Sequence, residues 1–354
     1  MADFVVTDER GATTSTITVL DDEDIETIGM WVLPGDLVGQ RVGVIAQPRV
    51  ADIVDSIVAN LTSRGATVVV IDVPDRDAAK TLTVAEMCYL KLNELGMTRD
   101  DTVVGIGGGS TTDLAGFVAA TYLRGIRCVL VPTTMLGAVD AAIGGKTAVN
   151  VGGKNLVGVF HHPERVVISA GVMLDLPRDI LREGTAEAVK AGFIADPELV
   201  VLYETFGLEA DVLSVIKRAV AVKTSVVSAD FRETGVRGIL NFGHTVGHAV
   251  ETLLGLSHGH AVAVGMVAAA RASTVALDFA EEDRVVSLIA ALGLPVSVDR
   301  DLGRSDVLRQ MQLDKKRDRS GFRMALLTRI GECRMASVDD ATVHAALSAI
   351  GIAN

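Results

Sequence analysis

Two histidines four residues apart, His244 and His248, lie in the otherwise apolar stretch LNFGHTVGHAVE. If residues 237–254 form one helix, Arg237 and Asn241 share a face with both imidazoles, because positions i, i+4, i+7 and i+11 lie on one side of a helix. Apolar residues occupy most of the remaining positions, so this polar stripe is too narrow to be a solvated face. We therefore predict that it lines a pocket, where imidazoles could bind a divalent metal ion.

Glycine precedes each histidine of the stripe, at positions 243 and 247. A glycine inside a helix lowers its stability by about 1 kcal/mol relative to alanine. We therefore expect a neighbouring element to pack closely against the backbone at Gly243 and Gly247.

Further polar residues could complete a metal site with these histidines. His258 begins the next helical pattern after a short turn, and Glu187 and Lys190 share a helix face inside the apolar segment GTAEAVKAGF. Two imidazoles and one carboxylate are an ordinary ligand set for catalytic zinc, which keeps a position open for substrate oxygens. Each residue also has a purely structural explanation: hydrogen-bonded core histidines, a helix cap at His258, and an internal ion pair between Glu187 and Lys190.

A second candidate site is the glycine-rich segment GIGGGSTTDLAGF, which follows a strand pattern and opens a helix. Gly107, Gly108 and Gly109 would let a pyrophosphate approach the backbone at a helix N-terminus. The spacing is not the G-x-G-x-x-G of the common dinucleotide-binding fold, and a tight turn without a ligand is the alternative. The segment PDRDAAK adds Asp77 for ribose hydroxyls and Lys80 for phosphate, or is simply a solvated turn.

These residues lie in two regions of different pattern. Up to about residue 170, β-branched runs alternate with amphipathic helical patterns, which predicts a parallel sheet with helices on its faces. Beyond it, long helical patterns dominate. We predict an α/β domain over 1–170 and a mainly α-helical domain over 171–354, from strands at 42–46, 67–72, 102–107 and 128–134 and helices at 51–63, 84–95, 211–229, 238–254 and 259–278.

The composition narrows the class of protein. The 354 residues carry a formal charge of −12 with no acidic tail, which argues against a broad surface for nucleic acid or anionic membrane. No apolar run has the length and purity of a membrane span or the layout of a signal peptide, so we expect a cytoplasmic protein. The three cysteines are far apart and predict neither a disulfide framework nor a thiolate metal cage.

Taken together, six blocks closely resemble the 3-dehydroquinate synthase family. The resemblance runs in order from about residue 40 to about 330, and its blocks are VPTTMLGAVDAAIGGKTAVN, GKNLVGVFHHP, GTAEAVKAGFI, GVRGILNFGHTVGHAVE, HGHAVAVGM and LDKK. The resemblance implies an N-terminal NAD-binding α/β domain, a C-terminal helical metal-binding domain, an active-site cleft between them and a homodimer. Zinc is the implied metal, with Co²⁺ as a substitute.

The resemblance also implies a role for individual residues. Glu187, His244 and His258 would bind the metal, and His248 would be a polar contact or proton-transfer group. NAD would be held by Asp77, Lys80, Gly107, Gly108, Gly109, Ser110, Asp113, Thr133, Thr134, Asp140, Lys146 and Lys154. Asp140 and Lys146 would also hold substrate hydroxyls. The carboxylate, phosphate and ring oxygens of the substrate would be contacted by Asn155, Lys190, Lys223, Arg237, Asn241 and Lys315, with Arg124 reaching the phosphate from the partner subunit.

The implied reaction converts 3-deoxy-D-arabino-heptulosonate 7-phosphate, a phosphorylated sugar acid, into 3-dehydroquinate and phosphate in the shikimate pathway. In that chemistry NAD takes a hydride from C5 and later returns it, so the net reaction is a lyase step. Two alternatives stay open. Another sugar phosphate cyclase, acting on the amino analogue of the heptulosonate, would keep the same carboxylate contacts. The GGGS-x-x-D pattern also resembles metal-dependent alcohol and glycerol dehydrogenases that use NAD.

Overall fold

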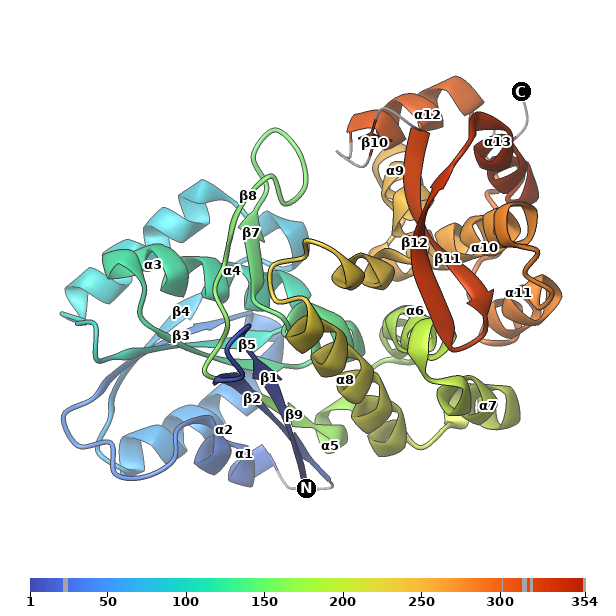
Figure 1. Cartoon of the computed structure of the whole chain (residues 1–354). Coiled ribbons are helices and arrows are strands. Elements are labelled where there is room, and N and C mark those ends of the chain that lie inside the picture. The colour runs from blue at the N-terminus through green and yellow to red at the C-terminus, as the bar shows by residue number, and fades with distance from the viewer. Residues whose placement is uncertain (22–24, 301, 314–316, 319–320, 353–354) are drawn as a thin grey trace. The chain divides into compact units, whose positions relative to one another are not determined.

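The structure, a computed structural model, describes residues 1–21, 25–300, 302–313, 317–318 and 321–352. The chain folds into two compact units (Figure 1). The first comprises Met1–Pro177 and Lys223–Arg232, and the second comprises Arg178–Val222 and Glu233–Asn354. Residues 223–232 therefore belong to the first unit, although they lie inside the range 171–354 that the sequence assigns to a second domain.

A seven-stranded sheet forms the core of the first unit, in the order β1-β2-β9-β6-β5-β3-β4. Neighbouring strands from β2 to β4 are all parallel, and β1 pairs antiparallel with β2 at one edge. The strands are β1 Ala2–Thr7, β2 Thr13–Leu20, β3 Arg41–Ala46, β4 Thr67–Asp72, β5 Thr102–Gly107, β6 Arg127–Pro132 and β9 Arg165–Ser169. Every residue of β5 is buried, as expected for a valine- and isoleucine-rich strand with both faces covered. The predicted parallel sheet is confirmed, whereas the β1–β2 hairpin was not predicted.

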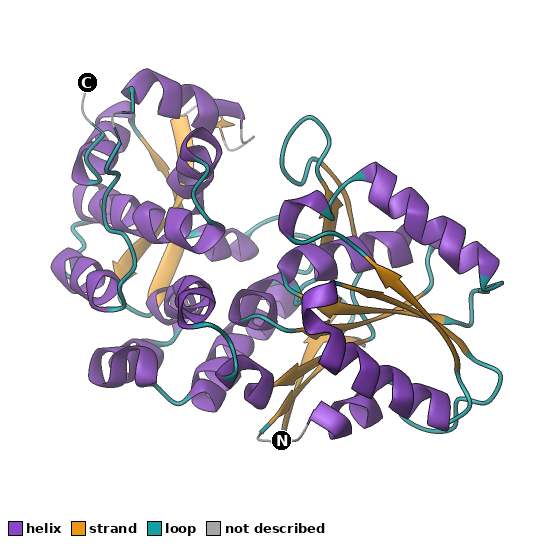
Figure 2. Cartoon of the chain, turned by 180° about the vertical axis from the view of Figure 1, so that it is seen from behind, coloured by secondary structure: helices purple, strands orange, loops and turns teal. Residues whose placement is uncertain are grey.

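Helices cover both faces of this sheet. Figure 1 shows α1 and α2 below it and α3 and α4 above it, and Figure 2 gives the view from behind. Their bounds are α1 Ile25–Val32, α2 Ala51–Ser63, α3 Leu82–Glu94, α4 Gly109–Thr121 and the short α5 Ala170–Leu174. A separate two-stranded hairpin, β7 Lys146–Val149 with β8 Val157–Phe160, packs near α4. The helices predicted at 51–63 and 84–95 are confirmed as α2 and α3.

The strand order reverses direction between β3 and β5. From β3 the chain continues outward to β4, and it then returns to place β5 on the other side of β3. In open parallel sheets, ligands bind outside the carboxyl ends of the strands at such a reversal. The glycine segment at 107–109 follows the carboxyl end of β5, so the topology places it where a ligand of this fold class would bind.

The second unit is mainly helical, as predicted. It contains α6 Arg178–Ala195, α7 Pro197–Phe206, the first part of α8 Val212–Ala229, α9 His244–Leu254, α10 His258–Leu277, α11 Glu282–Ala291, α12 Arg304–Leu313 and α13 Asp340–Ala349. By length and composition α10 could span a membrane, contrary to the expectation that no run would qualify, but most of it is buried inside the unit. This burial identifies α10 as a core helix. The unit also has a sheet that was not predicted, β10 Arg317–Asp318, β11 Gly321–Arg329 and β12 Glu332–Val338.

The single helix expected over 237–254 is wrong. Residues Val236–Asn241 form a 3₁₀ helix, and α9 starts only at His244. Gly243 separates the two with φ of +82°, a left-handed conformation that glycine adopts without strain. The stripe of polar residues that the periodicity suggested is therefore divided between two helices.

Candidate active site

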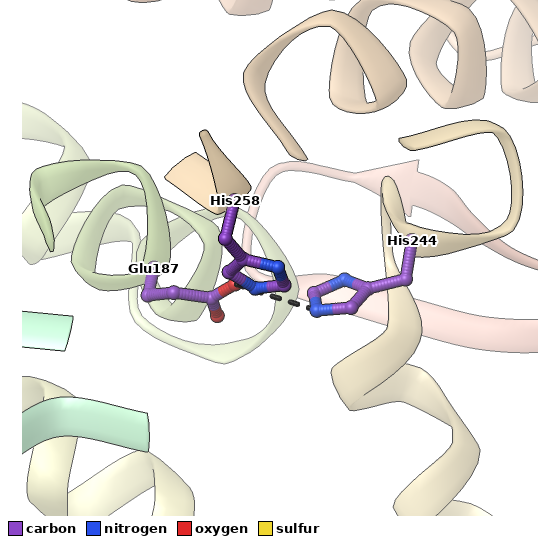
Figure 3. Close-up of side chains that lie close together, drawn as sticks. All are labelled: Glu187, His244 and His258. Atoms are coloured by element: carbon purple, nitrogen blue, oxygen red, sulfur yellow. Dashed lines mark hydrogen bonds and ion pairs between the residues drawn. The ribbon is translucent and has the colours of Figure 1, made fainter. Parts of the chain in front are cut away.

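Three side chains from three helices of the second unit meet at one point (Figure 3). Glu187 lies in α6, His244 begins α9 and His258 begins α10. The Nε2 atoms of His244 and His258 lie 3.4 and 3.3 Å from Oε1 of Glu187. Ligand atoms about 2.0–2.1 Å from a tetrahedral zinc ion lie about 3.3 Å from one another. The donor types and their spacing therefore fit a zinc site.

Glycines let these helices approach closely enough for the three side chains to meet. A Cβ atom on Gly259 would lie 2.2 Å from the carbonyl oxygen of Glu183 in α6. A Cβ on Gly243 or Gly247 would lie 2.6 or 2.8 Å from atoms of α10. The expected close packing at both glycines of the histidine segment is thus confirmed, and its partner is α10.

The electrostatics of the cluster are set by its burial and by Lys190. Lys190 pairs with Glu187 one helical turn away, and both side chains are almost fully buried. Burial alone would raise the pKa of Glu187, but Lys190 and His244 together hold it well below its ordinary value. Burial, with the charge of Lys190, lowers the pKa of His244 to about 3. The carboxylate is therefore ionised and His244 is neutral, which are the forms that bind a metal ion.

His258 lies between two carboxylates. Its Nε2 faces Glu187, and its Nδ1 lies 3.6 Å from Oε2 of Glu251, a buried residue of α9. Burial would lower the pKa of His258, but hydrogen bonding to Glu187 and Glu251 raises it to about 10. The sequence analysis missed Glu251, although its position seven residues after His244 places it on the same side of α9.

Other predicted residues of the second unit lie near the cluster or in the segment before it. The ring centroid of His248 is 5.1 Å from that of His244 and 6.0 Å from that of His258. Arg237 is almost fully buried in the 3₁₀ helix. Asn241, at the end of that helix, donates from Nδ2 to Oε1 of Glu233 at 3.2 Å. The sequence analysis did not predict Glu233 as a site residue. Its left-handed backbone (φ +57°) sets it apart, and this is visible only in the structure.

In the first unit, the glycine segment forms a tight strand-to-helix turn. Gly107 ends β5 with φ of +154°, Gly108 precedes α4, and Gly109 is its first residue, followed by Ser110. A Cβ on Gly107 would lie 2.7 Å from Oγ1 of Thr111, so this glycine is required by packing within the turn itself.

The neighbouring strand end contributes the two predicted threonines. Thr133 and Thr134 follow β6, and the backbone N–H of Thr133 donates to the carbonyl oxygen of Gly107 at 2.9 Å. A Cβ on Gly108 would lie 3.3 Å from the side chain of Thr134. The two segments therefore pack directly together beyond the carboxyl ends of β5 and β6.

Beside this turn is a partly buried polar group. Lys80 donates to Oδ2 of Asp113 in α4 at 2.5 Å and also to the side chain of Asn155. Burial raises the pKa of Asp113, and the charge of Lys80 opposes this rise. Asp77 forms a more exposed ion pair with Lys154 at 3.1 Å. The structure thus brings together residues that the sequence could only treat as separate segments.

Residues 223–232, the second segment of the first unit, place Lys223 next to Asp140. The Nζ atom of Lys223 lies 2.5 Å from Oδ1 of Asp140, which is in a π-helical turn, Gly137–Ala141. Phe231, near the end of that segment, stacks on His162 with ring centroids 3.9 Å apart. Of the other predicted residues, Lys146 begins β7, Arg124 is exposed after α4, and Lys315 lies outside the described residues.

The sequence matches two family models over most of its length. They are described as 3-dehydroquinate synthase N-terminal, matched by residues 70–183, and 3-dehydroquinate synthase C-terminal, matched by residues 184–317. The 3-dehydroquinate synthase of Nocardia farcinica is 43% identical over 323 residues, which cover 88% of this chain and 86% of that protein. This chain belongs to the 3-dehydroquinate synthase family. The resemblance predicted from six sequence blocks is therefore confirmed.

Solved structures extend the similarity beyond the 3-dehydroquinate synthases. A 2-epi-5-epi-valiolone synthase from Streptomyces hygroscopicus, solved with NAD⁺ and Zn²⁺ bound, is 26% identical with a TM-score of 0.83, over 94% of this chain and 96% of that chain. A 2-deoxy-scyllo-inosose synthase, solved with carbaglucose-6-phosphate, NAD⁺ and Co²⁺, is 24% identical with a TM-score of 0.84, over 97% of this chain and 98% of that chain. The fold of 3-dehydroquinate synthases is thus shared with synthases of other names.

Proposed function

We propose that this chain is a 3-dehydroquinate synthase, which converts 3-deoxy-D-arabino-heptulosonate 7-phosphate into 3-dehydroquinate and phosphate. The observation that carries the proposal is the convergence of Glu187, His244 and His258 in a member of this family. The donor set suits a metal ion that keeps a coordination position for substrate oxygens. A metal ion bound there would polarise a substrate oxygen.

The first unit is proposed to bind NAD. Support comes from the strand-order reversal beside the Gly107–Gly109 turn and from the N-terminus of α4, where backbone N–H groups can receive a pyrophosphate. NAD, when bound, would accept and return a substrate hydride. We assign Ser110, Thr133 and Thr134 to the same phosphate region, and Asp77, Lys80, Asp113 and Lys154 to the remainder of the cofactor.

The substrate carries a carboxylate and a phosphate, and this chain supplies cationic and amide groups to bind them. Lys223 and Arg237 are buried cationic side chains, and lysine and arginine form the stronger, charge-assisted hydrogen bonds to carboxylate and phosphate. We assign Lys223 and Arg237, together with Asn241 and His248, to the carboxylate and ring oxygens of the substrate. The remaining substrate contacts are assigned to Lys146, Asn155, Lys190, Arg124 and Lys315. Asp140, held by Lys223, would accept a hydrogen bond from a substrate hydroxyl.

The test is a phosphate-release assay with four substrates, run on enzyme supplied with NAD and Zn²⁺. They are the heptulosonate, its amino analogue, sedoheptulose 7-phosphate and glucose 6-phosphate. We expect release from the heptulosonate without accumulation of NADH, because the cofactor is regenerated in each turnover. A preference for either sugar that lacks a carboxylate would overturn the assignment, and a preference for the amino analogue would reassign the substrate. Net NADH formation from an alcohol would indicate a dehydrogenase.

We further propose that the enzyme is a cytoplasmic homodimer that binds neither nucleic acid nor membrane. Leu156, Val157, Val159 and Phe160 form an exposed apolar patch on and beside β8. An apolar patch of this kind is typical of an interface. Arg124 and the preceding Leu123 are both exposed and left-handed, a strained backbone that often marks a functional site. Light scattering should give a dimer mass, and replacing Val157 and Val159 together with lysine should give a monomer.

A further inference from the structure

His244 and His258 present the same ring nitrogen to Glu187. In both imidazoles it is Nε2 that lies within 3.4 Å of Oε1 of Glu187. A neutral imidazole has one bare nitrogen and one N–H, so a ring that binds metal through Nε2 must carry its proton on Nδ1. Each Nδ1 therefore needs a hydrogen-bond acceptor.

The acceptor differs between the two histidines. Nδ1 of His244 lies 3.2 Å from the backbone carbonyl oxygen of Phe242, which can only accept a hydrogen bond. Nδ1 of His258 instead faces the carboxylate of Glu251, with Oε2 at 3.6 Å. A carboxylate is the stronger acceptor, and it makes the imidazole a better ligand.

The fold holds Glu251 in place to do this. It lies on α9 two helical turns after His244, its side chain is almost fully buried, and α9 packs closely on α10 at Gly247. We infer that Glu251 is a positioning residue that fixes the ring and the tautomer of His258 so that Nε2 is directed to the metal. This inference rests on the metal site of the proposed function and adds to it a residue outside the three ligands.

A different role for Glu251 is also compatible with the distances. Ligand atoms of His248, Glu251 and His258 lie within 4.8 Å of one another and could hold a second ion. That arrangement would require His258 to bind one metal through each nitrogen and so to lose both ring protons. A neutral imidazole donating to Glu251 needs no such deprotonation, which favours the positioning role.

The experiment measures Zn²⁺ affinity and stoichiometry in metal-free full-length protein, by competition with a chromophoric chelator. Glu251→Ala removes the acceptor, whereas Glu251→Gln keeps a carbonyl oxygen of the same reach. We expect one Zn²⁺ per chain in the wild type, about 10–100-fold weaker binding in Glu251→Ala, and most of the affinity kept in Glu251→Gln. The visible spectrum of the Co²⁺ form should change in the alanine variant only, independently of turnover.

A matched control is Glu282→Gln, because Glu282 is a partly buried carboxylate that pairs with Arg271 of α10. It should leave Zn²⁺ affinity unchanged, and circular dichroism should show that all the metal-free variants are folded at the assay temperature. Three results would each overturn the positioning role. Glu251→Ala could bind Zn²⁺ as tightly as the wild type, or Glu251→Gln could lose as much affinity as Glu251→Ala. Alternatively, the wild type could bind two Zn²⁺ per chain and Glu251→Ala only one. A wild type that binds no stoichiometric Zn²⁺ would instead overturn the proposed metal site.

Discussion

Nε2 of His258 lies 3.3 Å from Oε1 of Glu187, although the two residues are 71 positions apart in the chain. His258 begins one helix and Glu187 lies within another, so their meeting depends on how α6 and α10 pack. The metal cluster is therefore a property of the helix packing in the second unit, and both its ligands and its packing residues can be tested.

The ligand assignment predicts different effects for neighbouring histidines. His244→Ala and His258→Ala should each lose most of the bound zinc, because each removes one of three protein ligands. His248→Ala should keep most of the metal while lowering turnover. Metal analysis of the purified proteins checks this, and the reverse pattern, with His248 required and His258 dispensable, would show that the ligands are assigned wrongly.

Gly259→Ala should disturb the site without touching a ligand. The new Cβ would meet the backbone of α6 at 2.2 Å, so α10 must shift and carry His258 with it. We expect a loss of about 1–3 kcal/mol in the free energy of unfolding, typical of overpacking, together with weaker zinc binding. Gly303→Ala is the control, since the nearest atom to its Cβ would be the end of a flexible aspartate side chain at 3.2 Å, with no backbone atom in the way. Equal behaviour of the two variants in urea unfolding would contradict the prediction.

Lys80→Met should destabilise the first unit by leaving Asp113 buried without its cation. Breaking such a pair typically costs about 3–5 kcal/mol. Burial already raises the pKa of Asp113, and loss of Lys80 should raise it further. A raised carboxyl pKa means that stability is lost as pH rises through it, so the defect should be larger near pH 8 than near pH 4.

The double variant Lys80→Met with Asp113→Asn provides the control for this pair. It removes the buried charge as well as its partner, so urea unfolding should recover most of the lost stability at high pH. If the double variant is as unstable as Lys80→Met alone, the defect does not come from the unpaired carboxylate.

Asp101 should stabilise the fold with the opposite pH dependence. Burial would raise its pKa, but hydrogen bonds from the backbone N–H groups of Thr98 and Arg41, at 2.6 and 2.8 Å, hold it below its ordinary value. Its stabilisation is therefore present above the ordinary aspartate pKa of about 3.9 and is lost as pH falls through the lower folded value. Asp101→Asn should cost about 1–3 kcal/mol at neutral pH and less in acid. The exposed Asp100→Asn is the control, and a pH-independent difference would refute the assignment.

The sequence predicted those parts of the fold whose pattern is local. The valine- and isoleucine-rich runs of β3, β4 and β5 indicated strands, and all three were found within a few residues. The expected burial is correct for β3 and β5, but β4 is the edge strand of the sheet and only Ile71 in it is buried. In contrast, β11 contains Met324, Ala325, Leu326 and Leu327, which favour helix, and its extended form comes from pairing with β12. Local propensity could not indicate that partner.

In the candidate site, too, local sequence patterns predicted some features, whereas contacts between distant residues could not be predicted. Residue types and the family resemblance were enough to select Glu187, His244 and His258. They did not reveal that Gly243 lies between two separate helices, or that Glu251 faces His258. Nor did any local pattern indicate that Lys223 belongs with Asp140 in the first unit, because that depends on the path of the chain.

The path of the chain between the two units limits how the polypeptide can be divided into fragments. The chain crosses between the units after Pro177, Val222 and Arg232, so no single break separates one unit from the other. A fragment ending at Pro177 would lack Phe231 and Lys223, the partners of His162 and Asp140. The complementary fragment would carry those residues without Asp140 and His162. Two such fragments should recover a native first unit only when they are produced together and reassociate.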